Sequence, residues 1–261
     1  MNLHFYKYQA TGNDFILIST IEQPFDEKNS AYISFLCDRH FGIGADGLLI
    51  LKKNPLYDFE MNYFNSDGFP STMCGNGGRC ITAFARHLNI IQQKCIFLAP
   101  DGIHTATIIN DSTVALNMKE VNQIIQHYDG VEINTGSPHF IVEYAKDIDQ
   151  LDVFNHGKNI RNLERFKPNG INVNFINRLN ENTIKVRTYE RGVETETLSC
   201  GTGSVASAIY TTLNKSDNDY LINILTRGGP LTVSFTKKNQ TYTNIWLTGE
   251  AKFVFEGYIN Y

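Results

Sequence analysis

The tetrapeptides Cys74-Gly75-Asn76-Gly77 and Cys200-Gly201-Thr202-Gly203 decide the fold, because they are two copies of one turn placed 126 residues apart. Each copy is followed by a pattern of helical periodicity that buries one stripe of small and aliphatic side chains. The stripe runs from Ile81 to Leu88 after the first copy and from Val205 to Leu213 after the second. A cysteine before a glycine-rich turn and a helix therefore occurs once in each half of the chain.

Three further blocks recur in the same order at offsets of 124 to 126 residues. Residues 11–16 return as 135–141 with one inserted residue, 44–48 return as 170–174, and the strand-like 61–65 return as 186–190. Any one match is weak, because glycine-rich turns are common. Four matches in register indicate that the chain is an internal duplication.

The duplication predicts the fold class. We expect an α/β protein of the α+β type, built from two pseudo-symmetric lobes of similar topology. Regular patterning breaks near residues 117–121, and the segment after about Glu250 has no counterpart in the first half, so we expect it to return to the first lobe. The predicted domains are residues 1–117 plus 250–261, which carry Cys74, and 118–249, which carry Cys200.

Composition excludes several classes of protein. Hydrophobic residues at 42% and charged residues at 19% are typical of a folded globular chain. The net charge of -4 and the absence of a basic stripe argue against a nucleic-acid partner. Polar residues such as Lys7 and Gln9 interrupt the first fourteen residues, and no apolar run approaches membrane-spanning length. We therefore expect a cytoplasmic protein with no membrane segment.

The five cysteines cannot all pair, and none forms a CxxC couple, so a disulfide framework or a zinc site has little support. Cys37, Cys80 and Cys95 lie in apolar surroundings and are predicted to be buried core residues. Cys74 and Cys200 could likewise be structural residues of duplicated turns. Against this, we expect the glycine turns to be exposed, and an exposed turn is a poor place to bury a thiol.

A cysteine directly before a helix lies near unpaired backbone N–H groups and the positive end of the helix dipole, and both favour the thiolate. The glycines let a ligand approach those N–H groups, which can then receive a carboxylate. In two pseudo-symmetric lobes, equivalent loops face each other across a cleft, which would set Cys74 and Cys200 on opposite sides of an α-carbon. One thiolate can remove the α-proton while the other thiol delivers a proton to the opposite face.

The repeated blocks also contribute polar side chains at strand and loop ends. They are Asn13, Asn65, Asn76, Asn172, Glu190 and Arg191. Each asparagine could bind a ligand or merely serve its turn. Arg191 could hold a second carboxylate bidentately or form an exposed ion pair, and His139 could tune a thiol or be a satisfied buried histidine.

With these residues in place, the sequence resembles the diaminopimelate epimerase family from end to end. These enzymes convert LL-2,6-diaminopimelate to the meso isomer in the synthesis of lysine and peptidoglycan precursors. The motifs that carry the resemblance are residues 10–15 (ATGNDF), 64–68 (FNSDG), 73–77 (MCGNG), 189–192 (YERG) and 196–203 (ETLSCGTG).

The resemblance implies roles for individual residues. It assigns proton transfer to Cys74 and Cys200, and binding of the reacting amino-acid end to Gly75, Asn76, Gly201 and Thr202. It assigns distal-end recognition to Asn13, Asn65, Asn172, Glu190 and Arg191, and modulation of the cysteine pKa values to His139 and Glu190. It also implies that each lobe is a β-sheet wrapped around a central helix, with the active site in the cleft between the lobes. The family is cytoplasmic, needs no metal or pyridoxal phosphate, and is commonly a homodimer.

Two positions depart from the family pattern. Gly47 stands where some members carry a substrate-contacting glutamine, and Ser137 stands where many carry an asparagine. Two other functions remain open from the sequence. A proline or hydroxyproline racemase shares the two-thiol logic, although Arg191 and the asparagines argue against it. A non-catalytic binding protein or thiol redox sensor could also use two low-pKa thiols.

Overall fold

The chain divides into two compact units in the computed structural model, which describes residues 2–260. Unit 1 comprises residues 2–116 and 249–260, and unit 2 comprises Asn117–Thr248. Unit 1 contains β1 (Asn2–Ala10), β2 (Asn13–Ser19), α1 (Ser30–Cys37), β3 (Gly47–Lys52), β4 (Phe59–Asn65), α2 (Gly75–His87), β5 (Lys94–Ala99), β6 (Gly102–Asn110), β7 (Thr113–Asn117) and β17 (Lys252–Asn260). β7 ends one residue beyond the boundary.

Unit 2 has a matching order of elements. They are β8 (Ile124–His127), β9 (Gly130–Asn134), β10 (Pro138–Glu143), α3 (Val153–Arg161), β11 (Asn172–Asn180), β12 (Thr183–Glu190), β13 (Thr195–Thr197), α4 (Gly201–Tyr210), β14 (Asn218–Thr226), β15 (Gly229–Lys238) and β16 (Thr241–Glu250). Two short 3-10 turns, Ile148–Gln150 and Glu164–Phe166, flank α3.

The strands of the two units pair in the same scheme. In unit 1, β1–β2 is antiparallel, β2–β3 parallel, β3–β4 antiparallel, β4–β5 parallel and β5–β6 antiparallel. In unit 2, β9–β10, β10–β11, β11–β12, β12–β14 and β14–β15 repeat that alternation. The predicted duplication is therefore confirmed as two repeated halves of a mixed α and β fold.

The outer partner of the first strand comes from different places in the two units. In unit 2, β8 pairs antiparallel with β9 and directly precedes it in the chain. In unit 1, β1 pairs antiparallel with β17, from Asn2 opposite Asn260 to Gln9 opposite Lys252. β17 is thus the antiparallel partner of the first strand in unit 1, as β8 is in unit 2.

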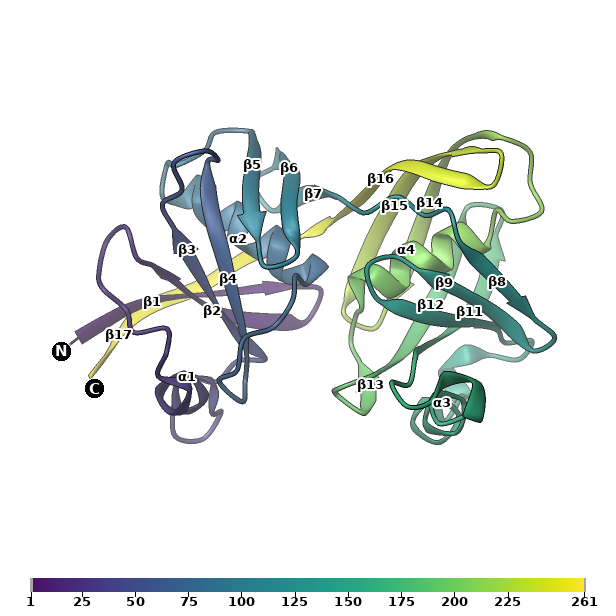
Figure 1. Ribbon diagram of the computed structural model, residues 1–261, viewed down its shortest axis with the longest axis horizontal. Helices are drawn as coiled ribbons and strands as arrows, with labels where there is room; N and C mark the ends of the chain where they lie inside the picture. The colour runs from purple at the N-terminus through teal and green to yellow at the C-terminus, as the bar shows by residue number, and fades with distance from the viewer. Residues whose placement is uncertain (1, 261) are drawn as a thin grey trace. The chain divides into compact units, whose positions relative to one another are not determined.

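One helix runs through the middle of each unit, with strands around it (Figure 1). α2 contacts β1, β2, β3, β4, β6 and β17, and α4 contacts β9, β10, β11, β12, β14 and β15. Both helices are buried over most of their length, because they present short side chains such as Gly78, Ser204 and Ala208 that let strands approach closely. The predicted architecture of a sheet wrapped around a central helix is confirmed.

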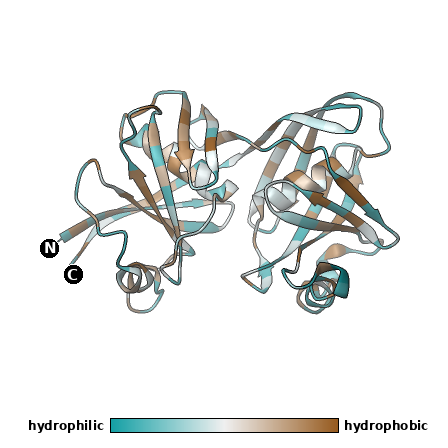
Figure 2. Ribbon diagram, in the orientation of Figure 1, coloured by the Kyte–Doolittle hydropathy of each residue, from teal (hydrophilic) through white to brown (hydrophobic). Residues whose placement is uncertain are grey.

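The middle strands of unit 2, β10 and β11, are buried on both faces over part of their length, because residues of α3 and of the segments beside it cover the outside. Ile141 and Ile176 pack in the cluster around α4, whereas Phe140 and Val173 pack in the cluster under α3. In unit 1, the outer face of β2 packs on α1 in the same way. Figure 2 shows the result: β3 is largely hydrophobic, whereas α3 is polar where it faces away from the sheet. Successive residues of a strand thus face different layers.

The three remaining cysteines are buried and unpaired with one another, as predicted: Cys37 ends α1, Cys80 lies in α2 and Cys95 lies in β5. The predicted helical stripes were too long at their ends. The helices stop at His87 and Tyr210, so Leu88 and Leu213 lie past the last turn and are only half-buried. Asn89 adopts a positive φ of 57° directly afterwards, which ends the first helix.

Candidate active site

Each predicted catalytic cysteine occupies the N-cap position of its unit's buried helix. Cys74 precedes α2 with φ -113° and ψ 131°, and Cys200 precedes α4 with φ -121° and ψ 115°. Neither side chain caps its own helix, so the sulfur does not consume the N–H groups of the first turn. Neither sulfur therefore competes with other acceptors for those groups.

The turns that carry the cysteines are more enclosed than we expected. Gly75, Gly77, Gly201 and Gly203 are buried, and Cys200 is only 8% exposed, whereas Cys74 is half-buried. The sequence argument from exposed glycine turns was therefore wrong. The glycines are buried because the helices begin inside the ring of strands, where a side chain has little space: a Cβ at Gly203 would lie 2.3 Å from Asn174 Oδ1.

Cys74 shares a hydrogen-bond acceptor with its neighbour in the helix. Its Sγ donates to Asn13 Oδ1 at 3.8 Å, and Asn76 Nδ2 donates to the same oxygen at 3.2 Å. Asn13 Nδ2 donates in turn to Asp46 Oδ2 at 2.7 Å. The parallel pairing of β2 with β3 brings Asn13 and Asp46 together, because Phe15 lies opposite Gly47. Asn13 and Asn76, both predicted site residues, thus meet at Cys74.

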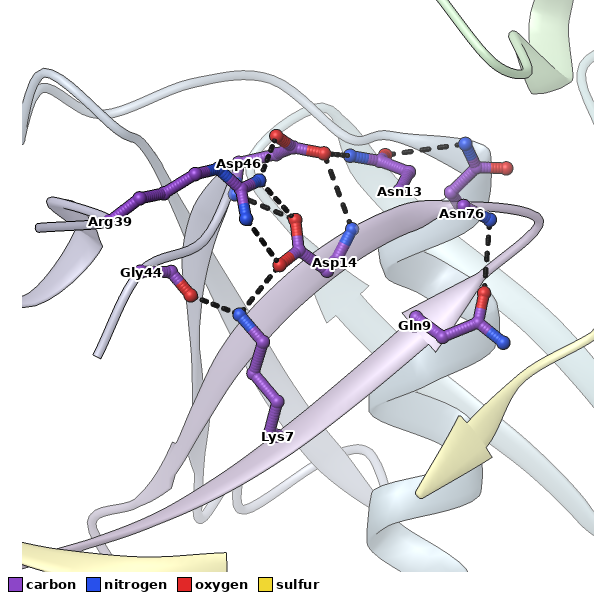
Figure 3. A network of polar contacts seen from close by, with 9 residues as sticks. Lys7, Gln9, Asn13, Asp14, Arg39, Gly44, Asp46 and Asn76 are labelled. Carbon is purple, nitrogen blue, oxygen red and sulfur yellow. Dashed lines mark hydrogen bonds and ion pairs between the residues drawn. The ribbon is translucent and has the colours of Figure 1, made fainter. Parts of the chain in front are cut away.

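Next to Asn13, four charged side chains form a cluster of ion pairs: Lys7, Asp14, Arg39 and Asp46 (Figure 3). Arg39 donates to both Asp14, at 2.7 and 3.1 Å, and Asp46, at 2.8 Å, and Lys7 Nζ lies 2.7 Å from Asp14. Burial opposes ionisation of Asp14, but the bonds from Arg39 and Lys7 outweigh it and lower the pKa of Asp14 to about 2. Asp14 is therefore ionised at neutral pH.

Arg79 is a buried residue of the candidate site that sequence reasoning missed. Its side chain is fully buried in α2 and donates to Asn76 Oδ1 at 2.9 Å and to Thr11 Oγ1 at 3.3 Å. It also donates to the backbone oxygens of Gly75 and Glu250. Burial lowers its pKa to about 10, which leaves it charged at neutral pH. One feature of the sequence could have identified Arg79: it is a charged residue among the small residues of a helix that was predicted to be buried.

In unit 2, Cys200 joins a chain that leads to His139. Cys200 Sγ lies 3.5 Å from Thr202 Oγ1, and Thr202 Oγ1 lies 2.9 Å from His139 Nε2. His139 is completely buried, and burial, helped by the nearby charge of Arg191, lowers its pKa to about 3. The imidazole is therefore neutral at physiological pH.

Two further residues support His139 from the inner face of the sheet. Asn174 Nδ2 lies 2.9 Å from His139 Nδ1, and Thr188 Oγ1 donates to Asn174 Oδ1 at 2.9 Å. Both lie on strands that face α4, and both belong to the duplicated blocks 170–174 and 186–190. The signal for Asn174 and Thr188 was thus present in the repeat, but nothing in the sequence distinguished them from their neighbours.

Three of the five residues predicted to recognise the distal end, Asn172, Glu190 and Arg191, lie together in unit 2, whereas Asn13 and Asn65 lie in unit 1. Asn172 is buried; its Oδ1 accepts from Arg191 N at 2.9 Å, and its Nδ2 donates to Ser137 Oγ and Pro138 O. Glu190 Oε2 accepts from Thr197 Oγ1 at 3.0 Å. The side-chain amide of Asn172 therefore holds the backbone at Arg191.

The two departures from the family pattern have structural consequences. A Cβ at Gly47 would lie 2.7 Å from Tyr63 Cε2, so the ring of Tyr63 occupies the space that a longer residue would need. Asn65, at the end of β4, lies opposite Gly47 in the β3–β4 register. Ser137 accepts the 2.8 Å bond from Asn172, which gives this serine a place in the same network.

The described part of the chain was also searched for metal ligands and membrane spans. Within residues 2–260, no group of three or more His, Cys, Asp or Glu side chains is arranged to hold a metal ion. No helix in that range is long and apolar enough to cross a membrane.

Solved structures share this fold over nearly their whole length. A PhzF-family phenazine biosynthesis protein from Bacillus anthracis aligns with a TM-score of 0.79 at 15% identity, covering 100% of both chains. A probable proline racemase from Agrobacterium radiobacter aligns with a TM-score of 0.69 at 14% identity, covering 99% of this chain and 93% of the other. These likenesses, at 14 and 15% identity, assign the chain to the two-unit fold that these proteins share.

The sequence comparisons specify the family. The profile described as "Diaminopimelate epimerase" matches residues 5–124 and 131–254. The chain is 50% identical over 251 residues to a diaminopimelate epimerase from Flavobacterium psychrophilum, covering 96% of this chain and 98% of the relative. It is 38% identical to one from Aquifex aeolicus, covering 98% and 97%. The chain belongs to the diaminopimelate epimerase family.

Proposed function

We propose that the chain converts LL-2,6-diaminopimelate to meso-diaminopimelate by a two-base mechanism, with Cys74 and Cys200 as the proton-transfer residues. The observation that carries the proposal is positional: each repeated unit places one cysteine at the N-cap of its buried helix. The family membership supplies the substrate, and it implies a place in the synthesis of lysine and peptidoglycan precursors.

The reaction needs one thiolate and one thiol. The thiolate takes the proton from the α-carbon, so a C–H bond breaks, an S–H bond forms and the electron pair stays on the substrate. The opposite thiol then gives its proton to the other face of that carbon and becomes the thiolate. The two sulfurs exchange roles, the substrate keeps its composition, and its configuration inverts.

The helix starts provide the electrostatic stabilisation that this chemistry requires. Loss of the α-proton moves negative charge onto the carboxylate, and preorganised N–H donors stabilise such charge most effectively where water is excluded. The N–H groups of the first turns, at Gly75, Asn76, Gly201 and Thr202, are the donors we assign to the reacting end.

The distal end of the substrate carries a second carboxylate and an ammonium group. We assign the carboxylate to Arg191, because a guanidinium can bind it bidentately and Asn172 fixes the backbone there at 2.9 Å. We assign the ammonium group to Glu190, with Asn13 and Asn65 as further polar contacts. His139 and Glu190 are the groups that we expect to modulate the cysteine pKa values.

The test is exchange of solvent deuterium into the α-position of LL- and meso-diaminopimelate under reducing conditions. Wild type should exchange with inversion. Cys74→Ala and Cys200→Ala should each lose turnover by roughly 100-fold or more, because each removes one proton-transfer group. Cys95→Ala is the matched control: it removes a buried thiol in β5 and should keep activity.

The outcomes separate the competing functions. Exchange that survives in both single-cysteine variants would refute the two-base mechanism. Absence of exchange with both isomers, combined with turnover of proline, would indicate a proline-type racemase. A redox sensor would cycle between oxidised and reduced forms without turning over either substrate.

We also propose that the chain is a cytoplasmic homodimer that binds a small-molecule substrate and no nucleic acid. β17 in unit 1 carries apolar side chains that are 45% to 71% exposed, namely Phe253, Val254, Phe255 and Tyr258. Exposed apolar side chains grouped on one strand are typical of a surface that is covered in an assembly. Light scattering of the purified chain tests the proposed dimer, and a monomer at micromolar concentration would contradict that dimer.

A further inference from the structure

The turn 190–194, between β12 and β13, carries the two residues of unit 2 that we assigned to the charged groups at the distal end of the substrate, Glu190 and Arg191. We propose that Glu194 and Arg161 are positioning residues that hold this turn in place for distal-end recognition. The inference rests on the proposed function, because it concerns how the residues assigned there are held. Neither Glu194 nor Arg161 stands in one of the four duplicated blocks.

Glu194 adopts a backbone conformation that glutamate disfavours. Its φ is 59°, in the left-handed region, where a residue with a Cβ is strained and glycine is not. The turn after β4 in unit 1 uses glycine for this purpose: Gly68 has φ 87° and donates its N–H to Asn65 O, as Glu194 donates to Glu190 O. Unit 2 therefore keeps a side chain where glycine would suit the backbone better, and strain that is kept in this way points to a role for the side chain.

The carboxylate of Glu194 binds groups from three places. Its Oε1 accepts from Gly192 N at 3.0 Å and from Arg161 Nη2 and Nε at 2.9 and 3.2 Å. Its Oε2 accepts from Tyr189 Oη at 3.1 Å. The carboxylate therefore connects the turn to the last residue of α3 and to a buried residue of β12.

Arg161 also contacts the second segment that lies next to Arg191. A Cβ at Gly170 would lie 2.6 Å from Arg161 Cζ, so the guanidinium packs directly on the backbone there. Nη1 of Arg191 lies 3.4 Å from Asn169 O and 3.5 Å from Gly170 O. One arginine of α3 thus contacts both the turn that contains Arg191 and the backbone on which the side chain of Arg191 lies.

α3 gives Arg161 a fixed origin, because the helix packs tightly on β12. A Cβ at Gly157 would lie 2.3 Å from Tyr189 Cβ, so helix and strand are in direct contact. Val153 and Ile160 belong with Tyr189 to the core cluster under α3. Figure 1 shows α3 next to β13, which it also contacts. The helix cannot shift relative to β12 without losing this packing.

The turn is therefore held at both ends. Asn172 Oδ1 accepts from Arg191 N at 2.9 Å at its start, and Glu194 fixes its other end. A guanidinium binds a carboxylate bidentately only in a narrow range of positions, and a residue that is already in place loses less freedom when its ligand binds. We therefore expect Glu194 to affect substrate affinity more than proton transfer at the cysteines.

The first test compares the KM and kcat of Glu194→Gly and Glu194→Gln for LL-diaminopimelate with those of wild type. Glycine removes the carboxylate but suits the positive φ, so the melting temperature should stay close to that of wild type. Its KM should rise about fivefold or more, with kcat changed by less than about twofold. Glutamine keeps an oxygen that can accept from Gly192 N and Arg161, and it should restore most of the KM. An unchanged KM in Glu194→Gly, or a loss confined to kcat, would overturn the proposal.

The control variant is Glu164→Gly. It makes the same substitution at an exposed carboxylate of unit 2 that pairs with Lys167 and lies outside the turn. Its KM should equal that of wild type. A rise in KM equal to that of Glu194→Gly would show that the loss of any surface carboxylate near α3 has this effect, which would overturn the proposal.

A double-mutant cycle with Arg191→Met distinguishes positioning from a general structural role. Solvent deuterium exchange at the α-carbon gives kcat/KM for each variant. If Glu194 acts through Arg191, the loss caused by Glu194→Gly should shrink to less than about twofold once Arg191 is absent. A loss by the same factor in both backgrounds would overturn the proposal. Arg161→Met should raise KM as Glu194→Gly does, and the two changes together should be no worse than either alone.

Hydrogen exchange of the substrate-free enzyme separates this inference from the proposed function. The amides of Arg191, Gly192 and Glu194 each donate a hydrogen bond, so peptides that cover 190–194 should exchange faster in Glu194→Gly than in Glu194→Gln. Equal exchange in the two variants would overturn the inference, whether or not substrate is converted. Failure of wild type to exchange the α-proton of either diaminopimelate isomer would reject the proposed function, and the amide exchange would still decide whether Glu194 holds the turn.

Discussion

At the scale of single residues, the buried imidazole of His139 couples the site to stability. Burial lowers its pKa to about 3, against an ordinary value near 6.5 in the unfolded chain. Between these values the unfolded state binds a proton that the folded state does not, so stability falls as the pH falls below about 6.5. Chemical denaturation at pH 7 and pH 5 should show wild type losing roughly 2 kcal/mol from this group.

The control for that prediction is His139→Gln, whose amide can still donate toward Thr202 but does not titrate. It should lose less stability than wild type over the same pH interval, by about the same 2 kcal/mol. An identical acid sensitivity in the two proteins would contradict the prediction, because it would show that His139 is already protonated in the folded protein at pH 5.

Site residues could be predicted from the sequence where the repeat marked them, and not where packing alone assigns the role. Cys74 and Cys200 stand in duplicated motifs, and the N-cap position follows from the glycines after them. Arg79 looked like any helical arginine, because only the assembled unit shows that strands close over it on every side. The partners of the side-chain hydrogen bonds at the site could not be predicted either, because only the folded unit brings those donors and acceptors together.

At the scale of elements, the close contact of α4 with β11 makes two equivalent glycines behave differently. Gly203 and Gly77 occupy the same place in the duplicated turns. A Cβ at Gly203 would lie 2.3 Å from Asn174 Oδ1 and 3.2 Å from His139 Cε1, whereas at Gly77 the nearest atoms are 3.5 Å away. Gly203→Ala should therefore cost about 1–3 kcal/mol through overpacking, measured by urea denaturation.

Gly77→Ala is the matched control, because it adds the same methyl group at the equivalent helix position. The new methyl group meets Leu49, Met61 and Cys74 at ordinary contact distances of 3.5 to 3.7 Å, and alanine favours a helix over glycine by about 0.8–1 kcal/mol. We expect it to be neutral or stabilising. Equal losses in the two variants would mean that α2 and α4 sit equally close to their strands.

At the scale of the whole molecule, the duplication is what made the fold predictable. Four blocks in register fixed the order of strands around each central helix, because each block supplies a strand end or a helix start in both units. The partner of β1 was harder to predict: residues after Glu250 have no repeat, so only their lack of a counterpart pointed back to the first half. The small strand β13, at Thr195–Thr197, was not foreseen, and in unit 1 the corresponding pairing is a single bridge between Phe64 and Pro70.

The role of β17 gives the final prediction, because unit 1 is continuous in space but not in sequence. Ending the chain at Ala251 removes the antiparallel partner of β1 and the contacts of Phe255 and Ile259 with the core around Phe5. Each lost ladder hydrogen bond costs about 0.5–1.5 kcal/mol, so unit 1 should lose several kcal/mol of stability.

Hydrogen exchange should show β1, β2 and α2 losing protection, whereas β9 to β12 and α4 keep theirs, since β8 covers β9 from within unit 2. Tyr258→Ser leaves the backbone pairing of β17 intact and should behave like wild type. Equal deprotection of both units in the truncated chain would contradict the independence of unit 2 and show that its stability depends on unit 1.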